Sequence, residues 1–499
     1  MSPLKPFSEN QSNLELIEID LSNSNDNLSK TMLFSDVSLG SLWNQTNDPN
    51  NISSHMVHIS PTEYFFAHHH STNDNGIEIG VMNVSTGIVW SQLRMIFNDN
   101  LYVAKNNDSI VFFGKYLSNS NYFIEEISFD GLNSTITDVP YEAYAISAYG
   151  DNIAITGSFS GTISFGSHSI SSRSGYSTAY SSSWTCQDVF VAVLNNMTNW
   201  AMATKSQGGS CAYNSAGGGR IAWTTNSLEI TNNSIVIHVR PTGSGGATSG
   251  GTFSGCSSTS GSRNAVISTL DIVTGNCKFE SIYETPGSKF SYDLEQVVFS
   301  GNETAVFSFE ALYPRIIWDN GTEEFLSNSN VANSKDNTVI SDIDCLDDFC
   351  WVIGSIKANI VLDGITYFAT NGNPTMFVGK YNLTSENWEY FNTAGGQSSD
   401  EGVEIVPIEY GAIFSAKVDP PSTFDAISIT SGNQDQAVVG RLISDSDLDS
   451  YNDIIDSFPQ IYSQWDDWDS DGFGDNPSGV NSDDCIFQYG NSYQDQDGC

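Results

Sequence analysis

The chain has 499 residues, of which 39% are hydrophobic and 12% aromatic, enough apolar material for a packed interior. Its 59 Asp and Glu outnumber its 18 Lys and Arg and give a formal net charge of −41. This balance argues against nucleic acid and anionic lipid surfaces as partners, because both are recognised through clustered Lys and Arg.

The N-terminal segment lacks a targeting signal. Met1 to Asp20 contains no apolar core of a signal peptide. No run in the chain approaches the roughly 20 apolar residues of a membrane span, so we expect no membrane insertion by this chain. Because the cysteines described below favour an oxidising compartment, we expect one or both natural ends to be missing, and with them a leader or an anchor.

Short apolar segments separated by Gly, Asn, Ser and Asp fill the chain from about Asn13 to Ser444. Leu14–Leu21 roughly alternates polar and apolar residues, as a half-buried strand does. Ile153–Phe159 and Val189–Leu194 are further apolar segments of strand length. No segment has a helical stripe with caps. The sequence therefore predicts an all-β protein.

Four segments share one unit, in which a strand, a polar turn and a second strand return a Trp or Cys to the core. They are Val81–Trp90, Val193–Trp200, Thr269–Cys277 and Lys380–Trp388. Their period of roughly 50 to 60 residues is in the range of four-stranded propeller blades. We predict a seven-bladed β-propeller with blades near 50–97, 98–145, 146–213, 214–284, 285–338, 339–400 and 401–443.

The predicted propeller, residues 50–443, lies between an N-terminal segment, 1–49, and a tail, 444–499. The last unit lacks an outer strand. We expect the strands near Leu14–Leu21 and Lys30–Phe34 to pair with it, which closes the ring and removes an exposed edge. A pair of β-sandwiches is the alternative architecture.

The unit at Val81–Trp90 keeps a Thr-Gly turn followed by Trp. In this it resembles the blades of quinoprotein-type and related secreted propellers. The resemblance covers four short windows and implies that this Trp locks adjacent blades together. It carries little information about a quinone cofactor.

The eight cysteines fall into four local pairs and lack the spacing of a zinc site. The pairs are Cys186 with Cys211, Cys256 with Cys277, Cys345 with Cys350, and Cys485 with Cys499. We predict disulfides, which form in an oxidising compartment. Asn-X-Ser/Thr sites recur and add weakly to this inference, for instance at Asn44, Asn51, Asn83, Asn133, Asn196, Asn302, Asn320 and Asn382.

The tail from Ser444 contains 14 Asp and no Glu, Lys or Arg, about a third of the net charge. Two runs place Asp at every second position. The first run contains Asp445, Asp447, Asp449, Asp453 and Asp456; the second contains Asp467, Asp469, Asp471 and Asp475. Closely spaced carboxylates in a tight loop converge on a hard cation, so we predict calcium at both runs. Flanking Pro459 and Pro477 and the absence of helices argue against an EF-hand pair.

The whole tail resembles an array of thrombospondin type 3 repeats, in the form found in secreted prokaryotic proteins. The residues that carry this resemblance are the two Asp runs, Asp456-Ser-Phe-Pro459, Asp471–Asn476, and the pair Cys485 and Cys499. Ser450 replaces the usual Gly of the first run, which weakens that site. The resemblance implies a chain with little hydrophobic core, wrapped around structural calcium and stapled by one disulfide.

Five of the seven histidines are close together in the first unit: His55, His58, His68, His69 and His70. A copper or zinc site is one interpretation, and an exposed polar strand or loop is the favoured one. There is no G-x-S-x-G, HExxH or recognisable triad order. Acid pairs for glycoside hydrolysis leave no trace in spacing, because they come from distant blades.

We therefore expect an extracellular or cell-surface calcium-binding protein. Its propeller would bind an extracellular protein or glycan as an adhesion module, on a calcium-stabilised stalk. The alternative is an extracellular propeller enzyme, either a polysaccharide hydrolase or lyase or a quinone-dependent dehydrogenase. Two or more carboxylates with an Arg in the channel would favour the enzyme.

Overall fold

The computed structural model describes most of the chain between residues 55 and 491 and two N-terminal strands. The described ranges are 16–20, 29–35, 55–69, 76–83, 86–97, 101–177, 182–207, 222–242, 253–256, 265–283, 293–298, 304–310, 312–326, 331–332, 337–369, 373–396, 398–408, 411–419, 421–424, 427–429, 436–445 and 456–491. All regular structure in these ranges is β-strand, which confirms the all-β prediction. In the described part there is no helix with the length and apolarity that crossing a bilayer requires.

Seven antiparallel sheets of four to six strands follow one another along the described chain. The first sheet contains β3 (His55–Ser60), β4 (Glu63–His69), β5 (Ile77–Asn83) and β6 (Gly87–Arg94). The second contains β7 (Tyr102–Lys105), β8 (Ser109–Lys115), β9 (Tyr122–Ser128) and β10 (Ser134–Val139). The third contains β11 (Ala145–Tyr149), β12 (Asn152–Phe159), β17 (Asp188–Asn195) and β18 (Asn199–Lys205). The fourth contains β19 (Ala222–Ile230), β20 (Ser234–Thr242), β21 (Ala265–Asp271) and β22 (Cys277–Tyr283).

Three sheets remain, and the last of them combines strands from the N-terminal and C-terminal parts of the chain. The fifth contains β23 (Leu294–Val298), β24 (Thr304–Glu310), β25 (Tyr313–Trp318) and β26 (Glu323–Phe325). The sixth contains β28 (Thr338–Leu346), β29 (Phe349–Ile356), β32 (Thr375–Asn382), β33 (Asn387–Gly396), β36 (Ser422–Phe424) and β37 (Ile427–Ile429). The seventh runs β34 (Glu401–Ile408), β35 (Gly411–Val418), β38 (Gln436–Asp445), β2 (Ser29–Ser35) and β1 (Leu16–Asp20), so β2 pairs antiparallel with β38.

Short hairpins and a small sheet are inserted between the main strands. In the third sheet they are β13 (Thr162–Phe165) with β14 (His168–Ser171), and β15 (Ser174–Ser177) with β16 (Ser182–Thr185). Beside the sixth sheet they are β27 (Val331–Ala332), β30 (Ile360–Leu362) and β31 (Ile365–Tyr367). These insertions lengthen the chain without changing the order of the four main strands.

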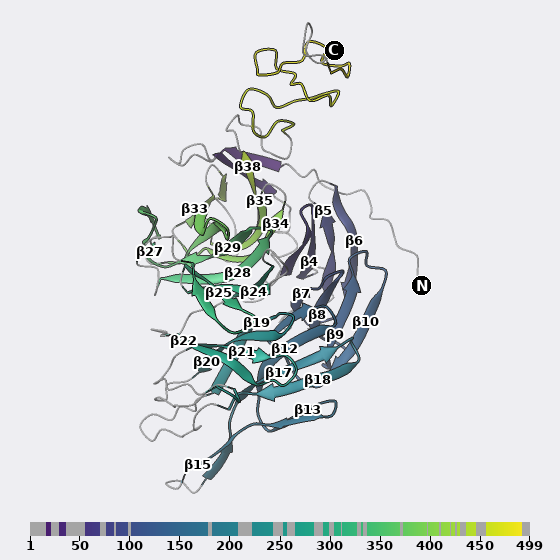
Figure 1. Ribbon diagram of the computed structural model, residues 1–499, viewed down its shortest axis with the longest axis vertical. Coiled ribbons are helices and arrows are strands. Elements are labelled where there is room, and N and C mark those ends of the chain that lie inside the picture. The colour runs from purple at the N-terminus through teal and green to yellow at the C-terminus, as the bar shows by residue number, and fades with distance from the viewer. Residues whose placement is uncertain are drawn as a thin grey trace.

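The first strands of the seven sheets form a closed circuit of contacts. In order they are β3, β7, β11, β19, β23, β28 and β34, and β34 contacts β3 again. Figure 1 shows the sheets following one another around an arc from β5 and β6, through β12 and β17, to β29 and β35. The arrangement is propeller-like, with the first strand of each sheet innermost.

The four repeat units predicted from sequence are the hairpins between the third and fourth strands of the first, third, fourth and sixth sheets. Each has a register shift between the two residues that precede the last Asn or Asp of the third strand, as between Val81 and Met82 or between Lys380 and Tyr381. The shared irregularity supports a structural repeat. In the first unit the Trp90 indole donates to the Phe129 carbonyl of the second sheet at 2.7 Å. This Trp therefore does link adjacent sheets.

Apolar side chains of neighbouring sheets meet in the interior between them. One cluster contains Phe113 of the second sheet with Ile155 and Phe190 of the third. Another contains Phe307 of the fifth sheet with Phe377 of the sixth. The core of the ring is thus a series of apolar layers between consecutive sheets. Other side chains line the axis of the ring.

Two of the four predicted disulfides join described residues, Cys256 to Cys277 and Cys345 to Cys350. Cys186 and Cys485 are also disulfide-bonded. Their expected partners, Cys211 and Cys499, lie outside the described residues.

The tail, residues 456–491, consists of turns and bends beyond β38 (Figure 1). Among these residues Phe473 is the one buried apolar side chain. The fully buried Gln464 replaces a hydrophobic core: its amide donates to the carbonyls of Asn476 and Val480 at 3.1 and 3.0 Å. Polar contacts therefore hold the tail together.

Candidate functional site

A cavity of about 780 Å³ lies on the axis of the ring. Its lining comes from the first strands of all seven sheets, so no single segment of the sequence encloses it. The volume is typical of a site for a small molecule or a short segment of a polymer.

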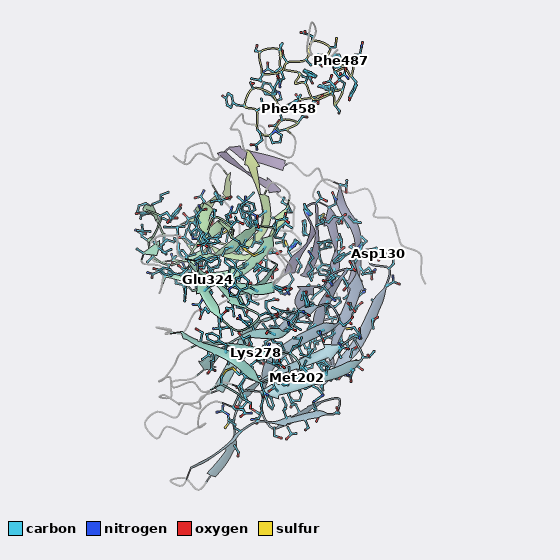
Figure 2. All side chains as sticks on the ribbon, in the orientation of Figure 1. Asp130, Met202, Lys278, Glu324, Phe458 and Phe487 are labelled. Carbon is cyan, nitrogen blue, oxygen red and sulfur yellow. A yellow bond between two sulfur atoms is a disulfide. The ribbon has the colours of Figure 1, made fainter. Side chains whose placement is uncertain are left out.

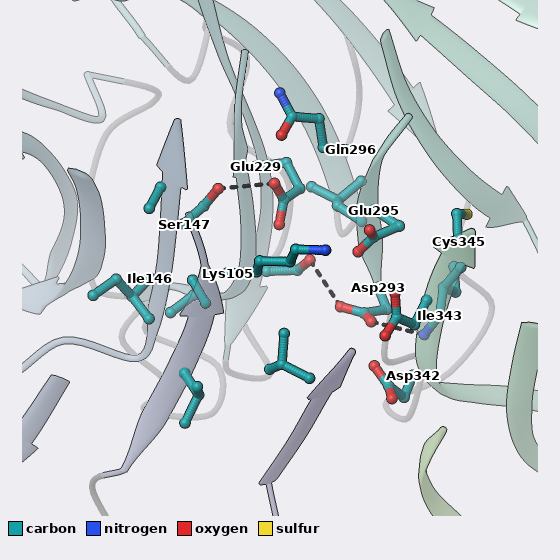
Figure 3. A pocket seen from close by; sticks show the side chains of 18 of the residues that line it. Lys105, Ile146, Ser147, Glu229, Asp293, Glu295, Gln296, Asp342, Ile343 and Cys345 are labelled. Atoms are coloured by element: carbon teal, nitrogen blue, oxygen red, sulfur yellow. Dashed lines mark hydrogen bonds between the residues drawn. The ribbon is translucent and has the colours of Figure 1, made fainter. Parts of the chain in front are cut away.

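Seven carboxylates line this cavity, all from one arc of the ring formed by β19, β23, β28 and β34 and the residues directly beside these strands. They are Glu229, Asp293, Glu295, Asp342, Asp344, Asp347 and Glu404. Figure 3 shows the carboxyl groups of Glu229, Asp293, Glu295 and Asp342 around one space, with Lys105 between them. No Arg belongs to the described lining. The cavity thus meets the carboxylate part of the criterion for an enzyme but not the Arg part, and Lys105 is its lysine.

Three of these carboxylates bind the backbone of the next sheet. Asp293 accepts from the Ile343 N–H at 3.1 Å, and Asp342 accepts from the Ile405 N–H at 2.7 Å. Glu404 accepts from the Met56 N–H, also at 2.7 Å. A carboxylate on one inner strand therefore joins it to the next strand around the ring, and these side chains also hold the cavity in shape.

Burial separates the pKa values of the cavity carboxyls. Burial raises the pKa of Glu229 to about 8, although its hydrogen bond from Ser147 at 2.8 Å lowers it. Burial also raises the pKa of Asp293 to about 6, while a hydrogen bond from the Asp342 carboxyl and two backbone N–H groups act in the opposite direction. Burial and then neighbouring carboxylates raise the pKa values of Glu295 and Asp342 well above their ordinary range. At neutral pH the cavity holds protonated and ionised carboxyls side by side.

The opposite arc, from β3 and β7, supplies the basic groups. Burial lowers the pKa of Lys105, and the charges of Asp344 and Glu295 partly restore it. His58 Nδ1 lies 2.5 Å from Asp344, and His55 Nδ1 lies 2.9 Å from Glu404. The favoured expectation of an exposed polar strand is wrong for these two histidines, because they turn inward to carboxylates. The side chains of His68, His69 and His70 lie outside the described part.

The tail forms a second cluster of carboxylates. One carboxylate oxygen from each of Asp467, Asp469 and Asp471 lies within 4.8 Å of the others, a triad that could hold a metal ion. Both oxygens of Asp469 and one oxygen of Asp475 are buried without a hydrogen-bond partner in the described structure. Buried carboxylate oxygens without partners are costly unless a cation neutralises them.

Asp483, which the sequence interpretation did not include, belongs to the same cluster. Its side chain is buried, and its Oδ2 has no hydrogen-bond partner among the described residues. Burial raises the pKa of Asp469, and the charges of Asp471, Asp483 and Asp467 raise it further. Asp483 follows Asn481-Ser482, where a parallel bridge between Gly474 and Ser482 returns the chain to the Asp run. Sequence spacing missed it because it lies eight residues beyond Asp475.

The first Asp run is described only at its two ends. Asp445 is the last residue of β38, and Asp447, Asp449 and Asp453 lie outside the described residues. Asp456 is buried, and its Oδ1 accepts the Phe458 N–H at 2.7 Å. The calcium prediction for this run therefore stays a prediction.

The cavity carboxylates do leave a trace in the sequence. Three inner strands share a three-residue pattern: Ser or Asp, then an aliphatic residue, then Asp or Glu. The three segments are Ser227-Leu-Glu229, Asp293-Leu-Glu295 and Asp342-Ile-Asp344. Alternation puts both polar side chains of each segment on one face of its strand. Three such segments in consecutive repeats, each at the start of a sheet, are the signal that identifies the cavity.

No family model and no curated sequence matches this chain. Solved structures with a similar backbone include a quinohemoprotein alcohol dehydrogenase from Pseudomonas putida, with 10% identity and a TM-score of 0.38 over 77% of this chain and 73% of that one. They also include hydrazine synthase from Kuenenia stuttgartiensis, with 10% identity and a TM-score of 0.38 over 74% and 93%. A third is oligogalacturonate lyase from Vibrio parahaemolyticus, with 9% identity and a TM-score of 0.36 over 86% and 97%. At these values the resemblance supports no activity for this chain.

Proposed function

We propose that the chain is an extracellular propeller enzyme whose axial cavity performs acid–base chemistry on a neutral, hydroxyl-rich substrate, with polysaccharide hydrolysis as the reaction. The observation that carries the proposal is the pair Glu229 and Asp293, buried in one cavity with pKa values of about 8 and about 6. Groups whose environments separate their pKa values in this way are suited to act as acid and base. Seven sheets around one axis would be seven blades.

In this mechanism Glu229 is the general acid and Asp293 the general base. At neutral pH Glu229 is mostly protonated and donates its proton to the leaving glycosidic oxygen. Asp293 is mostly ionised and accepts a proton from the attacking water. Ser147 holds Glu229, and the backbone N–H of Ile343 holds Asp293, so each group has a fixed position.

The charge of the cavity narrows the substrate class. Seven carboxyl groups face only Lys105, His55 and His58, and no Arg belongs to the described lining, so the site offers little to attract an anionic polysaccharide or a carboxylate-bearing quinone. This argues for hydrolysis of a neutral glycan over a lyase acting on uronic acids or a quinone-dependent dehydrogenase.

The test is product analysis on a panel of neutral polysaccharides. The native protein is expected to release reducing ends with a bell-shaped pH dependence whose limbs lie near pH 6 and pH 8. Glu229→Gln and Asp293→Asn are each expected to abolish release, and Asp138→Asn, at an exposed residue of β10, to leave it unchanged. Equal release by all four proteins would refute the proposal.

Binding without reaction is the second candidate function. It is favoured by the backbone hydrogen bonds of Asp293, Asp342 and Glu404, which give these carboxylates a structural role. In that case the propeller is an adhesion module for a glycan or an extracellular protein. Retention of a glycan on an array with no product, in wild type and both variants alike, would identify it.

Calcium in the tail completes the proposal. The donor set fits a hard cation, because Asp467, Asp469, Asp471, Asp475 and Asp483 offer only oxygen. The unpartnered oxygens of Asp469, Asp475 and Asp483 are the ones that an ion would satisfy. Calcium would then stabilise a stalk that has almost no apolar core. Titration calorimetry of the whole protein with calcium tests this, and the absence of heat at millimolar calcium would refute it.

The extracellular location is supported by the disulfides Cys256–Cys277 and Cys345–Cys350. Such bonds persist outside the reducing cytosol. Location can be tested by fractionating the source cells.

A further inference from the structure

The turns between the third and fourth strands carry a repeated sequence feature. In the first six sheets these two strands are consecutive in space and joined by a turn. Five of the six turns contain Asn-X-Ser/Thr with X other than Pro, beginning at Asn83, Asn133, Asn196, Asn320 and Asn382. The corresponding turn of the fourth sheet begins at Asp271, which ends the third strand as Asn83 and Asn382 do. Two further tripeptides of the described part, at Asn107 and Asn232, lie in turns between first and second strands.

Hydrogen bonds within the turn explain why a residue with a side-chain oxygen is found there. Asn320 Oδ1 accepts the Thr322 N–H at 2.8 Å, and Asn382 Oδ1 accepts the Thr384 N–H at 2.8 Å. Asp271 Oδ1 accepts the Thr274 N–H at the same distance. An Asp thus serves this turn as well as an Asn does, and the turn does not require the amide nitrogen.

Three of the five amides are on exposed side chains. Asn133, Asn196 and Asn320 are exposed. Among the described residues none accepts a hydrogen bond from the amide nitrogen of Asn133 or Asn320, and that of Asn196 donates only to the adjacent Asn195. Asn382 differs, because it is half-buried and its amide nitrogen donates to Glu389 at 2.7 Å.

We infer that Asn133, Asn196 and Asn320 are N-glycosylation sites, arranged as a row on one face of the ring. The strands of each sheet are antiparallel, so the turns between third and fourth strands all point to the same face. Asp130, in the turn before Asn133, lies at the rim of the molecule (Figure 2). This inference rests on the extracellular part of the proposed function and is independent of the reaction in the cavity.

The chemistry requires a lipid-linked sugar pyrophosphate as co-substrate. The amide nitrogen forms a bond to the anomeric carbon of the sugar, the bond from that carbon to the pyrophosphate oxygen breaks, and the amide proton is lost as the pyrophosphate departs. The glycan at Asn133 would lie beside Leu132, whose side chain is 81% exposed. A sugar there would cover an apolar side chain that water otherwise contacts.

Peptide mapping of the secreted protein tests the inference. The chain is expressed with a leader in a host that attaches N-linked glycans, then deglycosylated in ¹⁸O-water, which labels each formerly modified Asn as Asp. Label is expected at Asn133, Asn196 and Asn320. Unlabelled peptides at all three, while a secreted control protein with a known site is labelled, would overturn it.

Two variants separate glycosylation from turn structure. Asn320→Asp keeps a side-chain oxygen that can accept the Thr322 N–H, as Asp271 accepts the Thr274 N–H in its own turn. This variant is expected to lose one glycan and to keep its melting temperature. If this variant does not fold, Thr322→Ala serves, since it removes the acceptor tripeptide. Asn382→Asp is the matched control, because this Asn is half-buried and its amide nitrogen donates to Glu389. It is expected to leave the number of glycans unchanged, and loss of a glycan in this variant would overturn the requirement for an exposed amide.

Discussion

His58 Nδ1 lies 2.5 Å from Oδ1 of Asp344. This pair joins β3 of the first sheet to β28 of the sixth sheet, although β34 lies between these two strands in the ring. His55 pairs with Glu404 of β34 at 2.9 Å in the same place. The ring closes between the seventh and first sheets, so two histidine–carboxylate pairs lie at the closing seam. The raised pKa of His55 makes this seam sensitive to pH.

The first prediction concerns His55. Burial lowers its pKa, but the charge and hydrogen bond of Glu404 outweigh this, so the pKa is raised above the ordinary value of 6.5. The folded state binds the proton more tightly, so this stabilisation is complete below pH 6.5 and is lost as pH rises through the folded-state pKa. His55→Gln should lower the melting temperature at pH 5.5 more than at pH 9. His168→Gln, outside the cavity, should show no such pH dependence, and a larger loss at pH 9 for His55→Gln would contradict this assignment.

The second prediction concerns Glu229, whose pKa rises from 4.5 to about 8 on folding. Between these values the folded protein binds more protons than the unfolded chain, so this group makes stability fall as pH rises, by at most about 1.4 kcal/mol per pH unit. Glu229→Gln removes the titration. Urea melts should show the variant gaining stability relative to wild type from pH 4.5 to pH 8.5. The exposed Glu324→Gln should track wild type, and parallel curves for Glu229→Gln would disprove the buried proton.

The third prediction concerns calcium in the tail. Asp469→Asn removes one charge from the centre of the triad and should weaken calcium binding at least about tenfold, the effect usual for even an outer-shell change at a metal site. Asp484→Asn, at an exposed neighbour of Asp483, should weaken it little. Terbium luminescence sensitised by Trp468, between two of the triad residues, measures both. Equal affinities for the two variants would exclude the triad as the site.

The fourth prediction concerns the link between the first two sheets. Trp90→Phe deletes the hydrogen bond from Nε1 to the Phe129 carbonyl, 2.7 Å long, and keeps an aromatic ring. The free energy of unfolding should fall by about 1 kcal/mol, the usual net value of one such bond. Trp468→Phe, at a side chain 73% exposed, is the matched control and should have no effect. Chemical denaturation checks both, and identical midpoints for Trp90→Phe and wild type would show that the bond adds no stability.

The hairpins of the repeat could be predicted because all of their determinants are local. A strand of alternating residues, an Asn or Asp that binds the turn backbone, and a returning Trp lie within ten residues, as in Val81–Trp90. The repeat spacing then follows. The paired β13 and β14 could not be distinguished from a Ser-rich loop, because half of their residues are exposed and small.

The cavity could not be predicted in the same way because its members are far apart in the sequence. Asp293 and Asp342 share a hydrogen bond across 49 residues, and His58 and Asp344 across 286. Only the closed ring of inner strands brings them together. In the tail, by contrast, Asp467, Asp469 and Asp471 are neighbours in sequence and in space. Asp483 was missed because a bridge between Gly474 and Ser482 brings it back.

The pairing of β38 with both β35 and β2 has a mechanical consequence. The tail continues from Asp445, the last residue of β38, so a pull on the stalk acts along that strand. Gln436–Asp445 is held by eight residue pairs on the β35 side and five on the β2 side. A load along a strand between two partners stretches these hydrogen bonds together rather than one after another. The ring would then resist traction as a shear-loaded clamp.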